Sequence, residues 1–204
     1  TISIPRLAFG TTVLFQSFRF RLEGGLWTCL LGPSGVGKTT LLRLIAGLQP
    51  GARVVSEDGL PVAGRIALMA QEDLLLPWLS VLENALLGFR LRGERRRRGP
   101  ELEARARALL AELGLGAHLK ALPETLSGGM RQRVALARTL LEGRPVVLMD
   151  EPFSALDAIS RHRLQELAAR LLDQHTVLLV THSPLEALRL AHRIFVMGGR
   201  PVEL

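Results

Sequence analysis

The sequence predicts an α/β protein: a mostly parallel sheet with an antiparallel N-terminal part, interrupted by an inserted block of helices. Three observations lead to this prediction. Apolar runs alternate with helical patterns near both ends of the chain, as a parallel sheet with crossover helices requires. A glycine-rich turn at residues 32–39 joins one apolar run to a helix. Between residues 71 and 141 strand patterns vanish and helical periodicity replaces them.

The N-terminal part contains the first strands and one helix. Loose alternation through residues 2–22 predicts strands at 13–15 and 18–22. The apolar run 28–31 predicts a buried strand, and 40–48 a helix that ends near a glycine. Two further short strands, 53–55 and 65–69, flank an Asp58-Gly59 pair, which favours a tight hairpin turn.

The middle of the chain predicts three helices, at residues 79–91, 101–113 and 131–141. The second has leucines on one face, Pro100 before its first turn and Gly114 after its end. In the last part, strands are predicted at 145–150, 176–181 and 193–197, with helices at 158–172 and 184–191. The chain is therefore expected to form a single domain over 1–204, with 1–70 and 142–204 as the α/β core and 71–141 as the helical subdomain.

Composition limits the protein class. The single cysteine, Cys29, falls in a predicted buried strand, so a small core residue is the expected role and no internal disulfide can form. No apolar stretch approaches the roughly 20 residues of a membrane span, and no signal peptide is recognised at the N-terminus. These features predict a soluble cytosolic protein.

The net charge of +7 is partly local, because six arginines fall within residues 90–98. A solvated loop is the favoured interpretation. Contact with nucleic-acid phosphates or with an anionic membrane surface are the alternatives. Few aromatic residues interleave with the run, which argues against single-strand nucleic-acid binding.

The glycine-rich turn matches the phosphate-loop pattern G-x-x-x-x-G-K-[ST] between a predicted strand and a predicted helix. Its glycines allow backbone N–H groups to converge on phosphate oxygens, and the helix N-terminus adds positive dipole. Lys38 is expected to reach the β- and γ-phosphates, and the Thr39 hydroxyl to ligate Mg²⁺. The residues expected to bind the phosphates are Gly32, Pro33, Ser34, Gly35, Val36, Gly37, Lys38, Thr39 and Thr40.

Two acidic residues end the apolar strand 145–150, at the sheet edge where ligands bind in such folds. Asp150 is placed to hold Mg²⁺ through water, and Glu151 to orient and polarise the water that attacks the γ-phosphate. A phosphate loop alone fits kinases, GTPases, helicases and transport ATPases. A small-molecule kinase must exclude water, so the second carboxylate favours hydrolysis.

The stretch Ser127-Gly128-Gly129 precedes a predicted helix, where a serine N-cap is the simplest interpretation. Together with the acidic pair about 20 residues later, the stretch resembles the signature of ATP-binding cassette (ABC) proteins. The physical reading is a second anion site built from a hydroxyl, glycine N–H groups and a helix N-terminus. Two chains arranged head to tail would each place this signature on the other's ATP.

The resemblance covers essentially the whole chain and implies further site residues. Gln71 corresponds to the glutamine that contacts Mg²⁺ and water, and His182 to the switch histidine at the γ-phosphate. Asp157, in the stretch 154–157, corresponds to the loop that crosses the dimer interface. Phe9 corresponds to the aromatic residue that stacks on adenine. Met130 replaces a glutamine common in the family, and a C-terminal regulatory domain of the kind that some importers append is not expected.

The stretch 71–84 resembles that of importer ATPases for nitrate, sulfonate and taurine, and for pyrimidine precursors of thiamine. Its Leu, Pro and Trp residues suggest a docking surface; for Trp78 alone, a buried hinge is an equal alternative. The resemblance implies a homodimer at the cytoplasmic face of the inner membrane, a permease docked at 71–84, and a periplasmic binding protein. A cassette acting on nucleic acid or ribosomes is the rival function, and a phosphate-loop kinase is a third.

Overall fold

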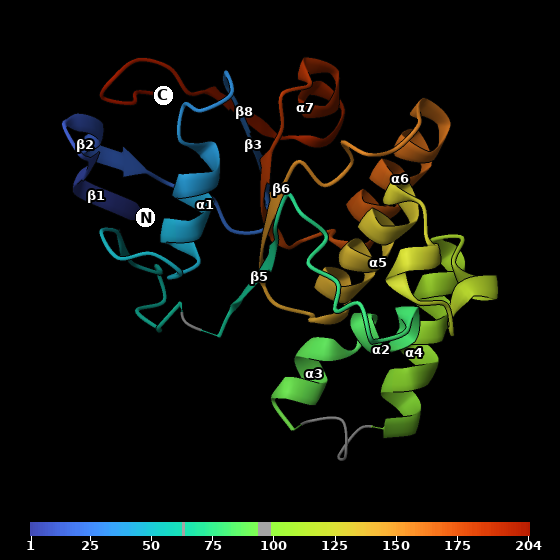
Figure 1. Ribbon diagram of the computed structural model, residues 1–204. Helices are drawn as coiled ribbons and strands as arrows, with labels where there is room; N and C mark the ends of the chain where they lie inside the picture. Colours follow the sequence, from blue (N-terminus) through green and yellow to red (C-terminus); the bar gives the residue numbers. More distant parts are fainter. Residues whose placement is uncertain (63, 94–98) are drawn as a thin grey trace. The chain divides into compact units, whose positions relative to one another are not determined.

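The computed structural model describes residues 1–62, 64–93 and 99–204. The chain forms two compact units (Figure 1). The first contains Thr1–Leu68, Arg144–Glu151 and Leu172–Leu204; the second contains Met69–Gly143 and Pro152–Leu171. Residues 152–171, grouped with the α/β core from sequence, pack within the second unit. The arginines at 95–98 lie outside the described residues.

A three-stranded antiparallel sheet forms the N-terminal part of the first unit. β1 (Ile2–Phe9) pairs with β2 (Thr12–Phe20) on one side and with β4 (Arg53–Val54) on the other. We predicted two separate strands within 13–22, but β2 is a single strand. It passes through Ser17 with a positive φ of 50°, so a local kink interrupts the alternation without ending the strand.

The main sheet of the first unit has five strands in the order β5-β6-β7-β3-β8. They are β3 (Trp27–Leu31), β5 (Ile66–Met69), β6 (Val146–Asp150), β7 (Thr176–Val180) and β8 (Arg193–Val196). β3 pairs in parallel with both β7 and β8, and β6 with β7. The predicted parallel sheet is confirmed.

The predicted hairpin around Asp58-Gly59 is wrong, because the strands on its two sides enter different sheets. β4 is only two residues long and pairs with β1, which places Val54 opposite Ile2. Val54 packs against the hydrophobic core there. Burial beside β1 outweighs the local preference of the turn residues.

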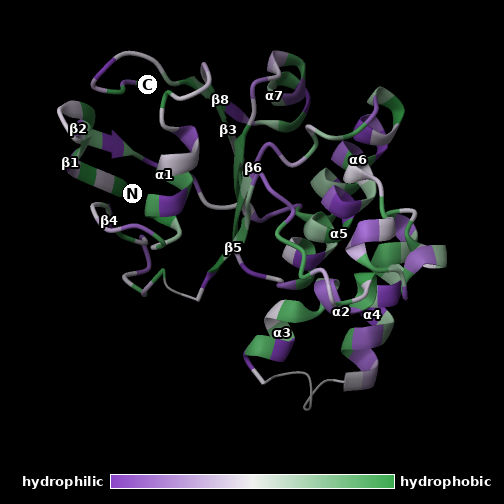
Figure 2. Ribbon diagram, in the orientation of Figure 1, coloured by the Kyte–Doolittle hydropathy of each residue, from purple (hydrophilic) through white to green (hydrophobic). Residues whose placement is uncertain are grey.

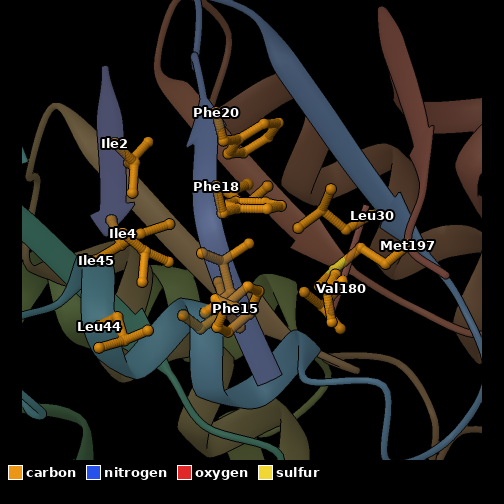
Figure 3. Close-up of a cluster of buried hydrophobic side chains, with 14 of the residues drawn as sticks. Ile2, Ile4, Phe15, Phe18, Phe20, Leu30, Leu44, Ile45, Val180 and Met197 are labelled. Atoms are coloured by element: carbon orange, nitrogen blue, oxygen red, sulfur yellow. The ribbon is translucent and has the colours of Figure 1, made fainter. Parts of the chain in front are cut away.

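The core of the first unit lies between the antiparallel sheet, helix α1 (Lys38–Ile45) and one face of the five-stranded sheet. Figure 3 shows Phe15, Phe18 and Phe20 of β2 directed toward Leu30 and Val180. Figure 2 shows the central strands as strongly hydrophobic, as expected for strands buried on both faces. Helix α7 (Pro184–Leu190) lies on the opposite face of this sheet from α1 (Figure 1). Cys29 is fully buried, and burial raises the pKa of its thiol to about 12.

The second unit is helical, as predicted. Its helices are α2 (Val81–Ala85), α3 (Leu87–Leu91), α4 (Gly99–Glu112), α5 (Gly128–Leu141) and α6 (Ala158–Leu171), with short 3₁₀ turns at Gly116–His118 and Pro123–Thr125. The helix predicted over 79–91 is broken at Leu86, whose backbone leaves the helical region. α5 begins three residues earlier than predicted, because Ser127 caps it.

Candidate functional site

The phosphate loop follows directly from the end of β3 and leads into the start of α1. A Cβ at Gly32 would stand 2.7 Å from the carbonyl oxygen of Met197, so only glycine fits there. Gly37, with φ of 115°, forms the N-cap of α1 in a conformation that side chains disfavour. It offers no side-chain acceptor, and the first turn of α1 carries no acidic residue. No side-chain cap therefore occupies the N–H groups at the start of α1, which makes this helix N-terminus suited to binding an anion.

Lys38 is folded back over the loop from which it projects. Its Nζ donates to the carbonyl oxygens of Gly32 at 2.7 Å and Pro33 at 2.9 Å, and the residue is buried. These two bonds hold the ammonium group at the loop that precedes α1. Positive charge and the N-terminus of a helix thus occur in one loop–helix stretch, which is suited to the phosphates of a nucleotide.

Thr39 and Asp150 come together from sequence positions 111 residues apart. The Thr39 hydroxyl donates to Oδ2 of Asp150 at 2.6 Å. Asp150 ends β6 and is buried, and this burial raises the pKa of its carboxyl, opposed by the Thr39 hydrogen bond. A hydroxyl and a buried carboxylate beside a phosphate site are the hard oxygen donors that Mg²⁺ takes in nucleotide sites. These residues fit Mg²⁺.

Glu151 and His182 form the next layer of the same site. Oε2 of Glu151 lies 3.1 Å from Nδ1 of His182. Glu151 has a positive φ of 48°, and its N–H donates to the carbonyl of Val180. Such a backbone conformation is costly for a residue with a side chain and is concentrated at functional sites. The carboxylate of Glu151 lies beside His182, two residues after the end of β7.

The remaining predicted nucleotide contacts of the first unit are Phe9 and Thr40. Phe9 ends β1, and its side chain is exposed, with 55% of its surface accessible. An exposed aromatic ring at a strand end is free to stack on a base. Thr40 lies in the first turn of α1, immediately after Thr39. Their contacts with a nucleotide remain predictions.

The other predicted site residues belong to the second unit. The Ser127 hydroxyl accepts from the N–H of Met130 at 3.2 Å, so it caps α5, with Gly128 and Gly129 in the first turn. A Cβ at Gly129 would stand 3.3 Å from the carbonyl oxygen of Ala155, which leaves little room for a larger residue. The signature is therefore a glycine-lined start of α5, and a helix N-terminus favours negative charge.

Asp157 and Gln71 are also in the second unit. Oδ1 of Asp157 accepts from the N–H of Ser160, and this bond lowers the pKa of the exposed carboxyl. Asp157 therefore caps the start of α6. Gln71 is exposed just after β5. The structure brings Lys38, Thr39, Asp150, Glu151 and His182 together in the first unit.

Several residues that organise the second unit were missed from sequence. Gln132, one turn into α5, accepts from the N–H of Ala155 and donates to the Ser154 hydroxyl. Asn84 is fully buried and bonds the backbone around Leu76 and Leu79. A polar residue in a helical pattern carries no sign of its distant contacts, so sequence periodicity assigns these residues to the surface.

Comparison with known proteins identifies the family. A model of the ABC transporter family matches residues 15–154. The chain is 43% identical to the aliphatic sulfonates import ATP-binding protein SsuB 1 of Pseudomonas savastanoi pv. phaseolicola, over 98% of this chain and 81% of that protein. It is 49% identical to SsuB 1 of Rhodococcus jostii, over 94% of this chain and 76% of that protein.

A solved structure shares the fold. The dimeric, post-hydrolysis structure of the ATP-binding cassette MJ0796, bound to ADP and Pi, has a TM-score of 0.81 and 28% identity and covers 96% of this chain and 94% of that one. Among the described residues, no helix is long and apolar enough to cross a membrane. The family match, the relatives and this structure together show that the chain belongs to the ABC transporter family and is one of its ATP-hydrolysing cassettes.

Proposed function

We propose that this cassette powers the import of an aliphatic sulfonate through a membrane permease. The observation that carries the proposal is the 43–49% identity to aliphatic sulfonates import ATP-binding proteins over nearly the whole chain. From the sequence alone, nitrate, taurine-like solutes and pyrimidine precursors were also candidates for the transported solute. These relatives favour the sulfonate. In this proposal the whole chain works as a single nucleotide-binding domain.

The chemistry follows from the residues of the first unit. Lys38 and the N–H groups of the loop and of α1 bind and orient the phosphates. Thr39 and Asp150 would hold Mg²⁺, which supplies charge neutralisation at the β- and γ-phosphates. Glu151 takes the proton from the attacking water, and His182, 3.1 Å from its carboxylate, fixes its orientation near the γ-phosphate. Phe9 and Thr40 add contacts to the base and the phosphates.

The second unit completes the reaction in a dimer. In this proposal, Ser127, Gly128 and Gly129 of one copy bind the γ-phosphate held by the other copy. Asp157 lies at the contact between copies, and Gln71 contacts Mg²⁺. The dimeric arrangement of the similar cassette bound to ADP and Pi supports this assembly. Because closure completes the site, an isolated copy should hydrolyse ATP slowly.

The docking segment, residues 71–84, is proposed to receive the permease. Trp78 is 71% exposed and Leu74 57% exposed in the second unit, so the alternative of a buried hinge is not supported for Trp78. Exposed apolar side chains of this size mark interaction surfaces. The cassette would therefore work at the cytoplasmic face of the inner membrane, supplied indirectly by a periplasmic binding protein.

The proposal is tested by purifying the tagged chain from its native host and identifying the proteins that accompany it by mass spectrometry. We expect a multi-span permease and a solute-binding protein that binds an alkanesulfonate in calorimetry. A binding protein that takes only a pyrimidine precursor would overturn the sulfonate assignment. Ribosomal proteins or nucleic acid without a permease would overturn the transport assignment.

A docking-segment variant sharpens this test. Trp78→Ala should lower the yield of permease about tenfold while ATP binding by the isolated chain is retained, since about 1.4 kcal/mol of lost contact corresponds to a factor of ten. Leu188→Ala is the matched control, because Leu188 is equally exposed but lies on α7. Equal permease yields for the two variants would count against docking at Trp78.

A further inference from the structure

The docking segment is fixed to the signature helix α5 by two arginines. Asp73 lies near the start of the segment, and its Oδ1 accepts from the N–H of Leu75 at 3.1 Å. Its other oxygen, Oδ2, accepts from Nε of Arg131 at 3.0 Å. One carboxylate thus shapes the local turn and joins it to α5. All the residues of this contact lie within the second unit.

Arg131 also reaches the residue that precedes the signature. While its Nε bonds Asp73, its Nη1 donates to the carbonyl oxygen of Leu126 at 2.8 Å. Leu126 is next to Ser127, the N-cap of α5. The planar guanidinium of Arg131, with its donors in a fixed fork, therefore bridges the residue before the signature and the start of the docking segment.

Arg138 repeats this contact two helical turns later, on the same face of α5. Its Nη2 donates to the carbonyl oxygen of Asp73 at 2.6 Å and its Nη1 to that of Leu74 at 2.9 Å. Burial lowers the pKa of the guanidinium, opposed by the charges of Asp73 and Glu142. Both carbonyls would otherwise require another donor, so Arg138 fixes the backbone itself rather than a mobile side chain.

Asn84 holds the opposite end of the segment. Its Oδ1 accepts from the N–H of Leu76 at 2.8 Å, and its Nδ2 donates to the carbonyls of Leu76, Leu79 and Ser80. The segment is therefore tied to α5 near its start and ordered within itself by Asn84, while Leu74 and Trp78 remain exposed. The apolar side chains are presented on a backbone that is tied to α5.

From these contacts we propose that Arg131 and Arg138 are positioning residues that make the docking segment move with the signature helix. The proposal rests on the proposed function of the docking segment. A shift of α5 on engaging ATP would be transmitted to Trp78 through Asp73 and the carbonyls of residues 73 and 74. Without the two guanidinium groups, residues 73 and 74 would lose their side-chain hydrogen bonds to α5 and follow its position less closely.

The first measurement is hydrogen–deuterium exchange of the full chain, with and without a non-hydrolysable ATP analogue. In wild type, the amides of residues 73–80 should be protected and should respond to the analogue. In Arg131→Met/Arg138→Met, which keeps the apolar stems but removes the donors, we expect at least tenfold faster exchange there and no response. Arg107→Met is the matched control, because Arg107 pairs with Glu103 on the exposed face of α4.

The second measurement is ATPase stimulation in the permease complex by its loaded binding protein. We expect the double variant to lose at least tenfold of the stimulation, while Arg138→Met alone leaves the KM for ATP of the isolated chain within twofold of wild type. Faster exchange with full stimulation would overturn the positioning role, as would unchanged exchange at residues 73–80. If a sulfonate-loaded binding protein does not stimulate the ATPase of wild type, the sulfonate assignment is wrong. The positioning role of the two arginines is then still decided by whether the ATP analogue changes the exchange of the amides of residues 73–80.

Discussion

The nucleotide site of the first unit and the docking segment of the second are held in place differently. In the phosphate loop, Lys38 bonds the carbonyls of Gly32 and Pro33, only six and five residues away. In the docking segment, Asp73 and Leu74 depend on Arg131 and Arg138, which lie 58 to 65 residues away. The first arrangement is built largely within one strand–loop–helix stretch, and the second depends on tertiary contacts.

This difference separates two functions of the cassette. A local phosphate site is formed wherever β3 and α1 are formed, and Thr39 needs only β6 beside it to meet Asp150. The position of the docking segment, in contrast, depends on the position of α5, whose arginines hydrogen-bond it. Binding of nucleotide should therefore survive changes in the second unit, whereas coupling to another protein should not.

The largest effect is expected from Lys38→Ala, which removes the cation over the phosphate loop. We expect ATP affinity to fall at least about 100-fold, or about 2.7 kcal/mol. Lys120→Ala is the control, since Lys120 is the only other lysine and is exposed in the second unit. Titration with a fluorescent nucleotide measures the affinity of both variants. Normal affinity in Lys38→Ala would contradict the assignment of the phosphate loop as the nucleotide site.

A smaller effect is expected from Ser127→Ala compared with Ser80→Ala. Both serines are N-caps, of α5 and α2, so each variant should lose about 1 kcal/mol of unfolding free energy. Only Ser127→Ala should also lose a hydrogen bond to phosphate, worth about 1.5–3 kcal/mol, and therefore about 10–100-fold in turnover. Denaturant titration and phosphate release measure the two quantities; equal turnover in the two variants would contradict the signature role.

The smallest effect concerns Asp150→Asn in the nucleotide-free chain. Because burial raises the folded pKa of this carboxyl, the folded state binds its proton more tightly than the unfolded state does. Its contribution to stability therefore falls as pH rises from about 4 through the folded pKa. At neutral pH the variant should melt higher, by about 2–4 °C per kcal/mol regained.

The pH dependence provides the check on that prediction. The melting difference between Asp150→Asn and wild type should shrink as the pH falls below about 4, where the carboxyl becomes protonated in the unfolded state as well as in the folded state. Saturating Mg²⁺ and ATP should reverse the order at neutral pH, because the amide is a poorer Mg²⁺ ligand than a carboxylate. If wild type without nucleotide melts higher than Asp150→Asn at neutral pH, burial of this carboxylate does not lower the stability of the folded state.

Features encoded in contiguous residues could be predicted from the sequence. The phosphate loop, the strand ending in Asp150 and the helical character of residues 71–141 all depend on local spacing and periodicity. The proximity of Thr39 and Asp150 also follows, because the phosphate loop with the first turn of α1 follows β3, Asp150 ends β6, and both strands end at the same edge of the parallel sheet.

Features decided by tertiary contacts could not be predicted. The Asp58-Gly59 turn predicted a hairpin, but β4 found its partner in β1. Nothing in a helical pattern distinguishes Arg131, which bonds Asp73, from Arg107, which pairs with Glu103 on the surface. Pairings between side chains 58 residues apart depend on how helices are docked, which periodicity does not specify.

The measurement that tests the account most directly compares Glu151→Gln with wild type. Glutamine keeps the shape of the side chain but cannot accept the proton of water. We expect ATP binding to be retained and phosphate release to fall at least about 100-fold. Light scattering should show that Glu151→Gln is a dimer with ATP and a monomer without it. Glu57→Gln is the control, because Glu57 is an exposed carboxylate of the same unit, and this variant should behave as wild type. Normal turnover in Glu151→Gln would contradict the assignment of Glu151 as the base.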